Sequence, residues 1–281
     1  MGPVWPDLQE LWLAGQWWIG APEPKIVDMK ITHIGGPTAV ISLGGLIFLT
    51  DPAFDEPRDY QLPGRVMTKL TGPAIPVAEL GPVDVVLLSH DQHKDNLDDA
   101  GRALLPSVPT VLSTPGAATR IPGVRALENW ESIDLPRPDG GVVTVTGVPA
   151  LHGPEGAESV LGVVTGFVLT GADLPTVYVS GDNASIGLVK EIADRCAPID
   201  VAVLFAGGAR TTLLDGAALT LTSESAVEAA HLLGSATIVP VHTEGWAHFT
   251  EGPDQFLKAF REAGLAARVA LLDHGVPTTV G

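Results

Sequence analysis

The sequence predicts an α/β fold in which two β-sheets pack face to face and helices cover their outer faces. Two observations predict it. Strand-like segments come first, strands mixed with helices follow, and the same order then occurs a second time along the chain. Hydrophobic residues make up 45% of the 281 residues and charged residues only 17%, so the chain can bury a sizeable core. No repeat of residue identity accompanies the two halves.

The first half begins with short β-rich segments at residues 31–33, 39–43 and 46–50. The last two are joined by Gly44-Gly45, a two-residue connection typical of a β-hairpin. Residues 51–81 show little periodicity and are longer than a connection needs to be, so we expect a loop that lies over a site. Residues 83–88 form an uninterrupted apolar run, which is typical of a buried strand.

The second half predicts five more strands and three helices. The apolar strand candidates lie at residues 142–148, 161–169, 176–180, 201–205 and 237–241. The helical candidates lie at residues 183–195, 223–233 and 254–263. We therefore expect each half to supply one sheet and the helices that cover it.

The first 24 residues differ from the rest of the chain. They hold four of the six tryptophans and show no strand alternation. We interpret residues 1–24 as a tryptophan-rich arm and residues 25–281 as the domain. The arm is either a lid or a homo-oligomer contact with aromatic anchors, or a short helix that covers a sheet edge.

Charge and cysteine content limit the partners and the compartment. Lys and Arg number 16 against 33 Asp and Glu, a formal net charge of −17, which repels nucleic-acid phosphates and anionic bilayers. A single cysteine, Cys196, excludes an intrachain disulfide and a thiolate-rich metal site. The apolar run at residues 38–50 is too short to span a bilayer. We expect a cytoplasmic protein that acts on a small molecule.

Histidines and carboxylates recur where predicted strands end. His90, His93 and Asp95 follow the strand at 83–88, and the later strands are followed in turn by His152, Asp182 and His242. Strand ends on one side of a sheet converge in space, so these groups are expected to meet in one cleft. Imidazoles and carboxylates without thiols suit zinc, and they also accept manganese or iron.

Each of these residues also has a structural interpretation. His90 and His93 could be surface-loop histidines, His152 a turn residue, and Asp182 the N-cap of the following helix. His248, close in sequence to His242, could donate a proton to a leaving group or an oxyanion, or could pack behind the site. The sequence around His33, His231 and His274 gives no reason to place them in a site.

Other reaction classes lack their motifs. The chain contains no Gly-x-Ser-x-Gly elbow for a serine hydrolase, no Gly-x-x-x-x-Gly-Lys phosphate loop, and no Gly-x-Gly-x-x-Gly that follows a strand. Cys196, beside Arg195 near a helix end, could be reactive, but we expect a lone buried thiol without catalytic function.

An ordered set of short motifs resembles that of the metallo-β-lactamase superfamily. The motifs are Thr50-Asp51-Pro52, Leu88-Ser89-His90 through Leu97-Asp98, Leu151-His152-Gly153, Ser180-Gly181-Asp182 and Val241-His242-Thr243. Within the superfamily the pattern is most similar to the branch of ascorbate-phosphate lactonases and N-acylphosphatidylethanolamine phospholipase D. The resemblance implies an αββα four-layer sandwich with a metal cleft along the edge where the sheets meet.

The resemblance also implies a role for each motif residue. His90, His93 and His152 would hold a first metal ion, Asp95 and His242 a second, and Asp182 would lie between the two. Asp51 would orient the ligands from behind. This chain reads His-x-x-His-x-Asp-Asn where the family usually reads His-x-His-x-Asp-His, so Asn96 replaces the last ligand and Gln92 competes with His93 for the second position. An amide is a weaker zinc ligand than an imidazole, so a second ion is expected to bind less tightly.

The function expected from these residues is that of a metal-dependent hydrolase. A cation at such a site lowers the pKa of bound water, so that a metal-bound hydroxide can attack a small ester, lactone or phosphodiester. Asp95 and His248 are the predicted catalytic residues. Arg58, Arg65 and Lys69, in the stretch at 51–81, could meet a phosphate or carboxylate, or could be solvated charges. The alternatives are a non-catalytic or regulatory member with partial metal occupancy and a di-iron member that performs oxygen chemistry.

Overall fold

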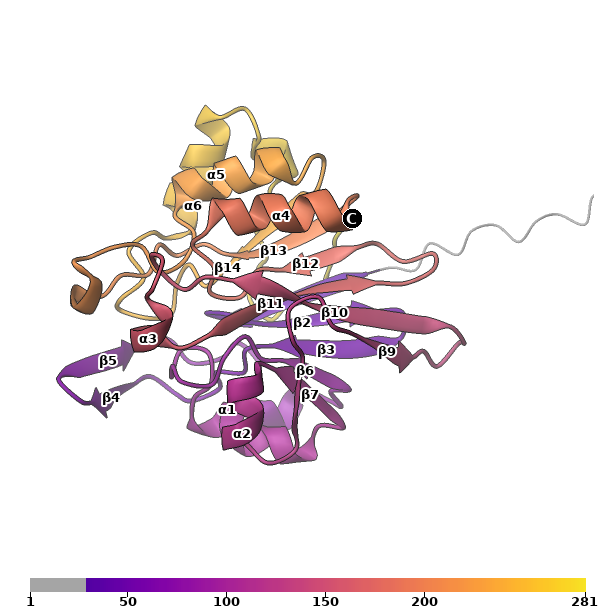
Figure 1. Cartoon of the computed structure of the whole chain (residues 1–281), viewed down its shortest axis with the longest axis horizontal. Coiled ribbons are helices and arrows are strands. Elements are labelled where there is room, and N and C mark those ends of the chain that lie inside the picture. Colours follow the sequence, from indigo (N-terminus) through magenta and orange to yellow (C-terminus); the bar gives the residue numbers. More distant parts are fainter. Residues whose placement is uncertain (1–28) are drawn as a thin grey trace, which may run out of the picture.

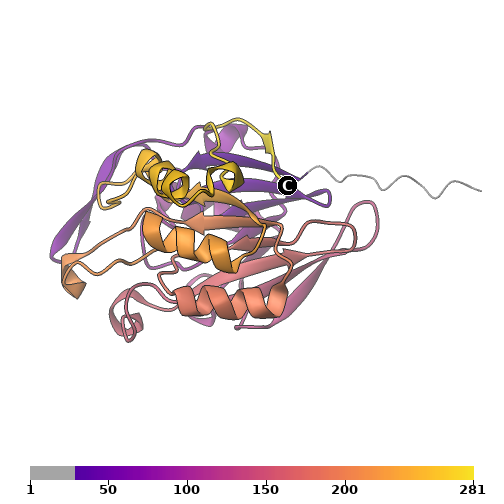
Figure 2. The ribbon, with the colours of Figure 1, turned by 90° about the horizontal axis from the view of Figure 1, so that it is seen from above.

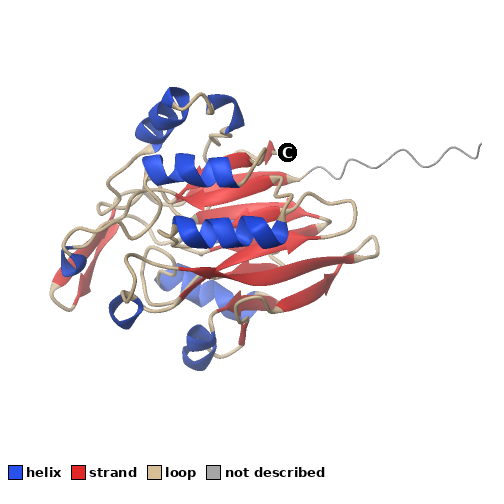
Figure 3. Cartoon of the chain, turned by 45° about the horizontal axis from the view of Figure 1, so that its top comes forward, coloured by secondary structure: helices blue, strands red, loops and turns tan. Residues whose placement is uncertain are grey.

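The computed structural model of the chain describes residues 29–281, and the predicted arm at residues 1–24 lies outside the described residues. Two large β-sheets pack face to face, and helices lie on both outer sides (Figures 1 and 3). The predicted four-layer α/β arrangement is therefore confirmed. Within residues 29–281 no helix has the length and apolar character needed to cross a membrane.

The first sheet comes from the first half of the chain and the C-terminal end. Its strands, in spatial order, are β15 (Thr278–Thr279), β1 (Lys30–Gly35), β2 (Thr38–Leu43), β3 (Leu46–Thr50), β6 (Val85–Leu87), β7 (Thr110–Ser113) and β8 (Val124–Ala126). Pairing is antiparallel from β15 to β3 and parallel from β3 to β8. Helices α1 (Asp99–Leu104) and α2 (Pro115–Arg120) belong to this half.

The second sheet repeats that pattern. Its strands, in spatial order, are β14 (Thr237–Val241), β13 (Val201–Phe205), β12 (Val177–Val179), β11 (Val164–Thr170), β10 (Val142–Ala150) and β9 (Ser132–Pro136). Pairing is antiparallel from β9 to β12 and parallel from β12 to β14. Helices α4 (Ile186–Cys196), α5 (Ser223–Leu232) and α6 (Pro253–Glu262) lie side by side over its outer face (Figure 2).

Alternating side chains of each sheet build separate apolar layers. Ile41 and Phe48 of the first sheet share one buried cluster with Phe167 and Val203 of the second, and this cluster fills the space between the sheets. The outer face of the second sheet packs against the helices through a second buried cluster. The outer face of the first sheet contributes to a third buried cluster. Where a strand is buried on both faces, as β13 and β14 are, its sequence is a nearly continuous apolar run.

Two predicted boundaries differ from the structure by three residues, and the others differ by two or fewer. The helix expected from residue 183 begins at Ile186, because Ser185 is its N-cap and accepts a hydrogen bond from the backbone of Leu188. The strand expected from residue 161 begins at Val164, because the preceding residues form the short helix α3 (Glu158–Leu161). The predicted hairpin at Gly44-Gly45 is confirmed by the pairing of β2 with β3.

The stretch at 51–81 was expected to be an irregular loop, and that expectation is wrong in part. It contains a hairpin of β4 (Arg58–Leu62) and β5 (Arg65–Lys69), which projects from one end of the sandwich (Figure 1). Tyr60 and Met67 form a small buried cluster with Trp246, and the rings of Tyr60 and Trp246 stack at 5.6 Å. The contact with a tryptophan far along the chain orders a segment that has little periodicity of its own.

Candidate metal centre

The predicted site residues come together where strands of both sheets end. Asp51 directly follows β3, the segment from Ser89 follows β6, and His242 directly follows β14. His152 lies just beyond β10, and Asp182 lies just beyond β12. All six predicted metal-ligating residues fall into two overlapping groups of side chains, which share Asp182. The predicted convergence in one cleft is therefore observed.

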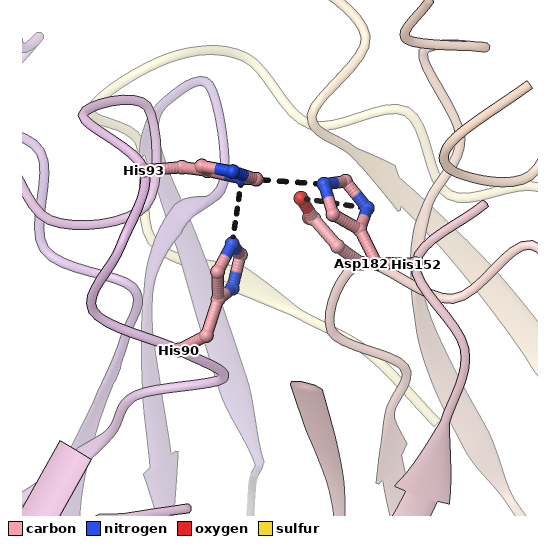
Figure 4. Close-up of side chains that lie close together, drawn as sticks. All are labelled: His90, His93, His152 and Asp182. Carbon is pink, nitrogen blue, oxygen red and sulfur yellow. Dashed lines mark hydrogen bonds and ion pairs between the residues drawn. The ribbon is translucent and has the colours of Figure 1, made fainter. Parts of the chain in front are cut away.

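The first group consists of three imidazoles and a carboxylate, from His90, His93, His152 and Asp182 (Figure 4). His93 Nδ1 lies 2.9 Å from His90 Nε2 and 3.2 Å from His152 Nε2. His152 Nδ1 donates to the carbonyl of Leu219 at 2.9 Å, so its Nε2 carries the lone pair that faces the group. Gln92, the alternative to His93, is exposed and lies outside both groups.

The second group consists of Asp95, Asp182 and His242. His242 Nε2 lies 3.3 Å from Asp95 Oδ2 and 3.5 Å from Asp182 Oδ1. Asp95 Oδ1, Asp182 Oδ2 and His242 Nε2 are buried and have no hydrogen-bond partner among residues 29–281. Buried polar atoms are rarely left without a hydrogen-bond partner. Two carboxylate oxygens and an imidazole nitrogen that lie together without partners are suitable ligands for a divalent cation.

Asn96 is oriented as a donor. Its Nδ2 donates to Asp51 Oδ2 at 2.9 Å and to Asp182 Oδ1 at 3.1 Å, and its Oδ1 is buried without a partner in the described part of the chain. The amide nitrogen therefore links two carboxylates by donating a hydrogen bond to each. A histidine that binds a metal at this position would present a nitrogen lone pair instead. This orientation agrees with the expectation that Asn96 is a poor substitute for the last histidine of the family motif.

Asp51 lies behind the first group and supports it. Its carboxylate accepts hydrogen bonds from Ser89 N at 2.5 Å and from Ser89 Oγ at 2.6 Å, and Ser89 Oγ is 3.0 Å from His90 Nδ1. Complete burial raises the pKa of Asp51 to about 7. The chain from Asp51 through Ser89 thus fixes the ring of His90 with Nε2 toward the group.

Burial decides the charge of the first group. Burial and, after it, the neighbouring His93 lower the pKa of His90 to about 3. Burial and the neighbouring His152 lower the pKa of His93 to about 4. Both rings are therefore neutral at pH 7, which is the form in which histidine binds a metal.

The second group has the opposite electrostatics. Burial alone would raise the pKa of Asp95, but His248 and His242 hold it well below its usual range. Burial alone would lower the pKa of His242, but Asp182 and Asp95 raise it. In the absence of a cation, a proton on His242 therefore balances the two carboxylates.

The backbone brings His242 close to its neighbours. His242 has a positive φ of 57°, and its N–H donates to the carbonyl of Gly36 at 2.7 Å. A side chain at Gly207 would collide with the carbonyl oxygen of His242, so only glycine permits the approach of these two segments. The ring of His242 also lies 3.9 Å from that of Phe249, centroid to centroid.

Both groups of metal-ligating side chains border a pocket with a volume of about 280 Å³. His93, Asp95, His152 and His248 line it. His248 Nε2 lies 3.0 Å from Asp95 Oδ2, and the side chain of His248 is 24% exposed. The predicted catalytic pair is thus in contact in the wall of this pocket.

The remaining histidines behave differently from one another. His231 is exposed in the last turn of α5. His33 and His274, which gave no signal in the sequence, lie close to Glu244 in a third group, and His274 Nε2 is 2.8 Å from Glu244 Oε1. These three residues come from segments far apart in the chain, so no local pattern could have revealed the contact.

Comparisons with known proteins agree with this geometry. The family model "Beta-lactamase superfamily domain" matches residues 47–243, which include all six predicted metal-ligating residues. The chain belongs to the metallo-β-lactamase superfamily. It is 32% identical over 253 residues to a "UPF0173 metal-dependent hydrolase" of Pelotomaculum thermopropionicum, covering 88% of this chain and 98% of the relative. This superfamily member therefore belongs to the UPF0173 metal-dependent hydrolase family, and the prediction of an enzyme of that class is confirmed at the level of the family.

Solved structures show the same fold. The structure of the isothiocyanate hydrolase from Delia radicum gut bacteria matches this one with a TM-score of 0.77 and 24% sequence identity. The match covers 90% of the present chain and all of the hydrolase. A possible metal-dependent hydrolase from Veillonella parvula is 19% identical, with a TM-score of 0.73 over the same shares. The predicted metallo-β-lactamase fold is therefore confirmed.

Proposed function

We propose that this protein hydrolyses a small ester, lactone or phosphodiester with divalent cations held by the two overlapping groups. His90, His93 and His152 hold the first cation, Asp95 and His242 the second, and Asp182 lies between them. The observation that carries the proposal is the gathering of imidazoles, with the neutral rings of His90 and His93 among them, and of unpaired buried carboxylate oxygens beside a pocket. Zinc is the first choice for this donor set, and manganese or iron is the alternative.

The chain's own residues prepare the site for hydrolysis. A cation bound here activates a water molecule and polarises the substrate oxygen. Asp51 and Ser89 orient His90, and the Leu219 carbonyl orients His152, so that the nitrogens face inward without further rearrangement. His248 faces the pocket and shares a hydrogen bond with Asp95, so we propose that this pair delivers a proton to the leaving group.

Two further features belong to this proposal. The motif resemblance to ascorbate-phosphate lactonases and to a phospholipase D favours a lactone or a phosphodiester as the bond that is cleaved. One cysteine in 281 residues favours a reducing compartment, and we propose the cytoplasm. The net charge of −17 argues for a small-molecule substrate and against nucleic acid, and an oligomer contact through residues 1–24 stays a prediction.

The test compares chelated protein with protein reloaded with zinc, manganese or iron. Bis(p-nitrophenyl) phosphate and a γ-thiobutyrolactone serve as generic probes, with His152→Ala as the ligand variant and the exposed His231→Ala as its control. We expect hydrolysis only after reloading, a loss of at least about 100-fold in His152→Ala, and wild-type rates in His231→Ala.

Four results would contradict the proposal. Hydrolysis that resists the chelator, or full metal content in His152→Ala, would show that the groups are not the metal centre. Less than half an equivalent of metal with no turnover would favour a non-catalytic member of the fold. A coloured iron-loaded protein that consumes oxygen would favour di-iron chemistry.

A further inference from the structure

We propose that the pocket binds substrates that carry an oxyanionic group, a carboxylate or a phosphate, and that Arg65 and Arg210 bind this group. The proposal rests on the proposed function, because it names the substrate class of the same site. The anionic group belongs to the part of the substrate that is not cleaved. The two arginines would therefore determine which substrates the enzyme accepts.

Two segments far apart in the sequence bring these arginines to the pocket. Arg65 is the first residue of β5, so the projecting hairpin forms one part of the wall. Arg210 lies shortly after β13, in the segment that continues toward Leu219. Both line the same pocket as His93, Asp95 and His248. A substrate whose reacting bond lies at the histidines therefore has its far end within the space that the arginines border.

Neither arginine has an acidic partner in the part of the chain that the structure describes. Arg58 lies 3.5 Å from both Asp55 and Asp99, and Lys69 lies 2.9 Å from Asp98. By contrast, no carboxylate among residues 29–281 lies within ion-pair distance of Arg65 or Arg210. Of the three cations that the sequence singled out in this stretch, only Arg65 is left for a ligand, and Arg210 was not anticipated.

The protein's overall charge makes this arrangement unusual. The described chain has many more carboxylates than cations, in a sequence with 33 acidic and 16 basic residues. Arg210 Nη1 donates to the carbonyl of Gly216 at 2.6 Å, which leaves its positive charge without a counter-charge. Two arginines without an acidic partner at one pocket create a local positive region in an acidic protein, and such a region concentrates anionic ligands. The guanidinium group matches the geometry of carboxylate and phosphate oxygens, with which it forms paired charge-assisted hydrogen bonds.

The rest of the wall limits the body of the substrate. Val66, Met67, Leu161 and Leu219 line the pocket beside the arginines. A pocket volume of about 280 Å³ lies near the lower end of ligand sites. The geometry therefore fits a small molecule with a short apolar body, a hydrolysable group at one end and an oxyanion at the other.

The first test measures binding and needs no turnover. Glutarate and its neutral analogue glutaramide are titrated by calorimetry into the metal-loaded and the chelated protein. We expect glutarate to bind at least about tenfold more tightly than glutaramide in both states. Arg65→Gln and Arg210→Gln should each remove most of this preference, and Arg65→Lys should restore part of it. Arg58→Gln, from the neighbouring strand of the hairpin, is the matched control and should bind as the wild type does.

The second test uses turnover by the metal-loaded enzyme. Mono-p-nitrophenyl glutarate and p-nitrophenyl hexanoate share the same leaving group, and only the first carries an anion. We expect a higher kcat/KM for the glutarate ester, and we expect the arginine variants to raise its KM about tenfold with little change in kcat. The hexanoate ester should be unaffected by either variant.

The outcomes separate this proposal from the proposed function. Equal binding of glutarate to Arg65→Gln, Arg210→Gln and wild type would overturn it, because the anion would then be held by the metal centre alone. Failure to bind metal would overturn the proposed function, whereas arginine-dependent binding to chelated protein would still support the anion site. Equal affinity for glutarate and glutaramide in the wild type, both metal-loaded and chelated, would also overturn the proposed anion site.

Discussion

The inward-facing nitrogens of His90 and His152 are set by partners on the other side of each ring. Leu219 fixes His152 through its carbonyl, and Ser89 links His90 to Asp51. The partners are buried, so each tautomer is held in a surrounding of low polarity. The metal-ligating residues could be predicted because they follow apolar strands in sequence. Of their partners, Asp51 was expected from the family resemblance. The Leu219 carbonyl could not be predicted, because a backbone carbonyl carries no sequence signal.

The sequence could not predict which of the loop cations face the pocket. Arg58, Arg65 and Lys69 share one face of the hairpin, because Lys69 pairs with Arg58 and lies four residues after Arg65 on the same strand. Arg65 lies beside the turn, at the opposite end from the other two, so only Arg65 lines the pocket, whereas Arg58 and Lys69 pair with carboxylates. Arg210 lies 145 residues beyond Arg65 and joins it only in three dimensions. The same reason explains why the contact between His274 and Glu244 was not anticipated.

The pair of His274 and Glu244 predicts a pH-dependent contribution to stability. The hydrogen bond between them raises the pKa of His274 above its ordinary 6.5 and lowers that of Glu244 below its ordinary 4.5. The stabilisation that comes from protonated His274 is fully present below pH 6.5, and it is lost as the pH rises through the raised pKa of His274. The Glu244 contribution is full above pH 4.5 and is lost as the pH falls through the lowered pKa.

His274→Asn should therefore lower the free energy of unfolding near pH 5.5 and have no effect near pH 9. Both side chains are 40% exposed, so the loss should be only about 0.5 kcal/mol. Urea unfolding at the two pH values measures it, with His231→Asn as the control. An equal loss at both pH values would show that packing, and not the ion pair, is responsible.

At the scale of elements, a buried ion pair attaches the β4–β5 hairpin to helix α1. Lys69 Nζ lies 2.9 Å from Asp98 Oδ2 and donates to the carbonyl of Ala53 at 2.9 Å. Asp98 is the N-cap of α1 and accepts from Gly101 N at 2.9 Å. The two side chains are 5% and 0% exposed, so removal of one partner leaves a charge buried without its counter-charge.

Lys69→Met should therefore lower the free energy of unfolding by about 3 kcal/mol, although methionine retains the apolar stem. Urea unfolding measures the loss. Lys258→Met is the matched control, because Lys258 is 69% exposed in its pair with Glu262, and its effect should stay below about 0.5 kcal/mol. A loss below about 1 kcal/mol in Lys69→Met would show that the pair does not attach the hairpin.

Two helical glycines predict opposite effects of the same substitution. A side chain at Gly101 in α1 would collide with the backbone of Pro52, directly after Asp51, whereas the nearest atom to one at Gly187 in α4 would be Ser185 Oγ at 3.7 Å. Gly187→Ala should raise the free energy of unfolding by about 0.5 kcal/mol, because alanine is the better helix former. Gly101→Ala should lower it by about 2 kcal/mol, because α1 must move away from Pro52. Thermal unfolding measures both, and stabilisation by Gly101→Ala would contradict the close packing of α1.

Elements with continuous apolar runs were predicted well, and the others were missed. β13 and β14 are buried on both faces and appear in the sequence as apolar runs. β9 pairs only with β10 and is partly exposed, so it has no such run. β8 has three residues, which is too short for a pattern to emerge. Short and edge strands depend on their partner strand more than on their own sequence.

At the scale of the whole molecule, the two halves of the chain meet at the site. The first sheet supplies Asp51, His90 and Asp95 at the ends of its strands, and the second supplies Asp182 and His242. Each half could be predicted as a sheet with helices, but the way their ends face one another came from the family resemblance. A cation held by residues of both halves would bind the native state alone and would therefore stabilise the whole molecule.

The most direct test of the metal centre is a zinc titration of the chelated protein, followed by thermal unfolding with simultaneous measurement of bound metal. We predict up to two bound equivalents. At a thousandfold excess over the dissociation constant, the free energy of unfolding should rise by about 4 kcal/mol. The melting temperature should rise by roughly 10 °C. His152→Ala should lose most of this rise, whereas the same rise in His152→Ala, or no bound zinc in the wild type, would contradict the metal centre.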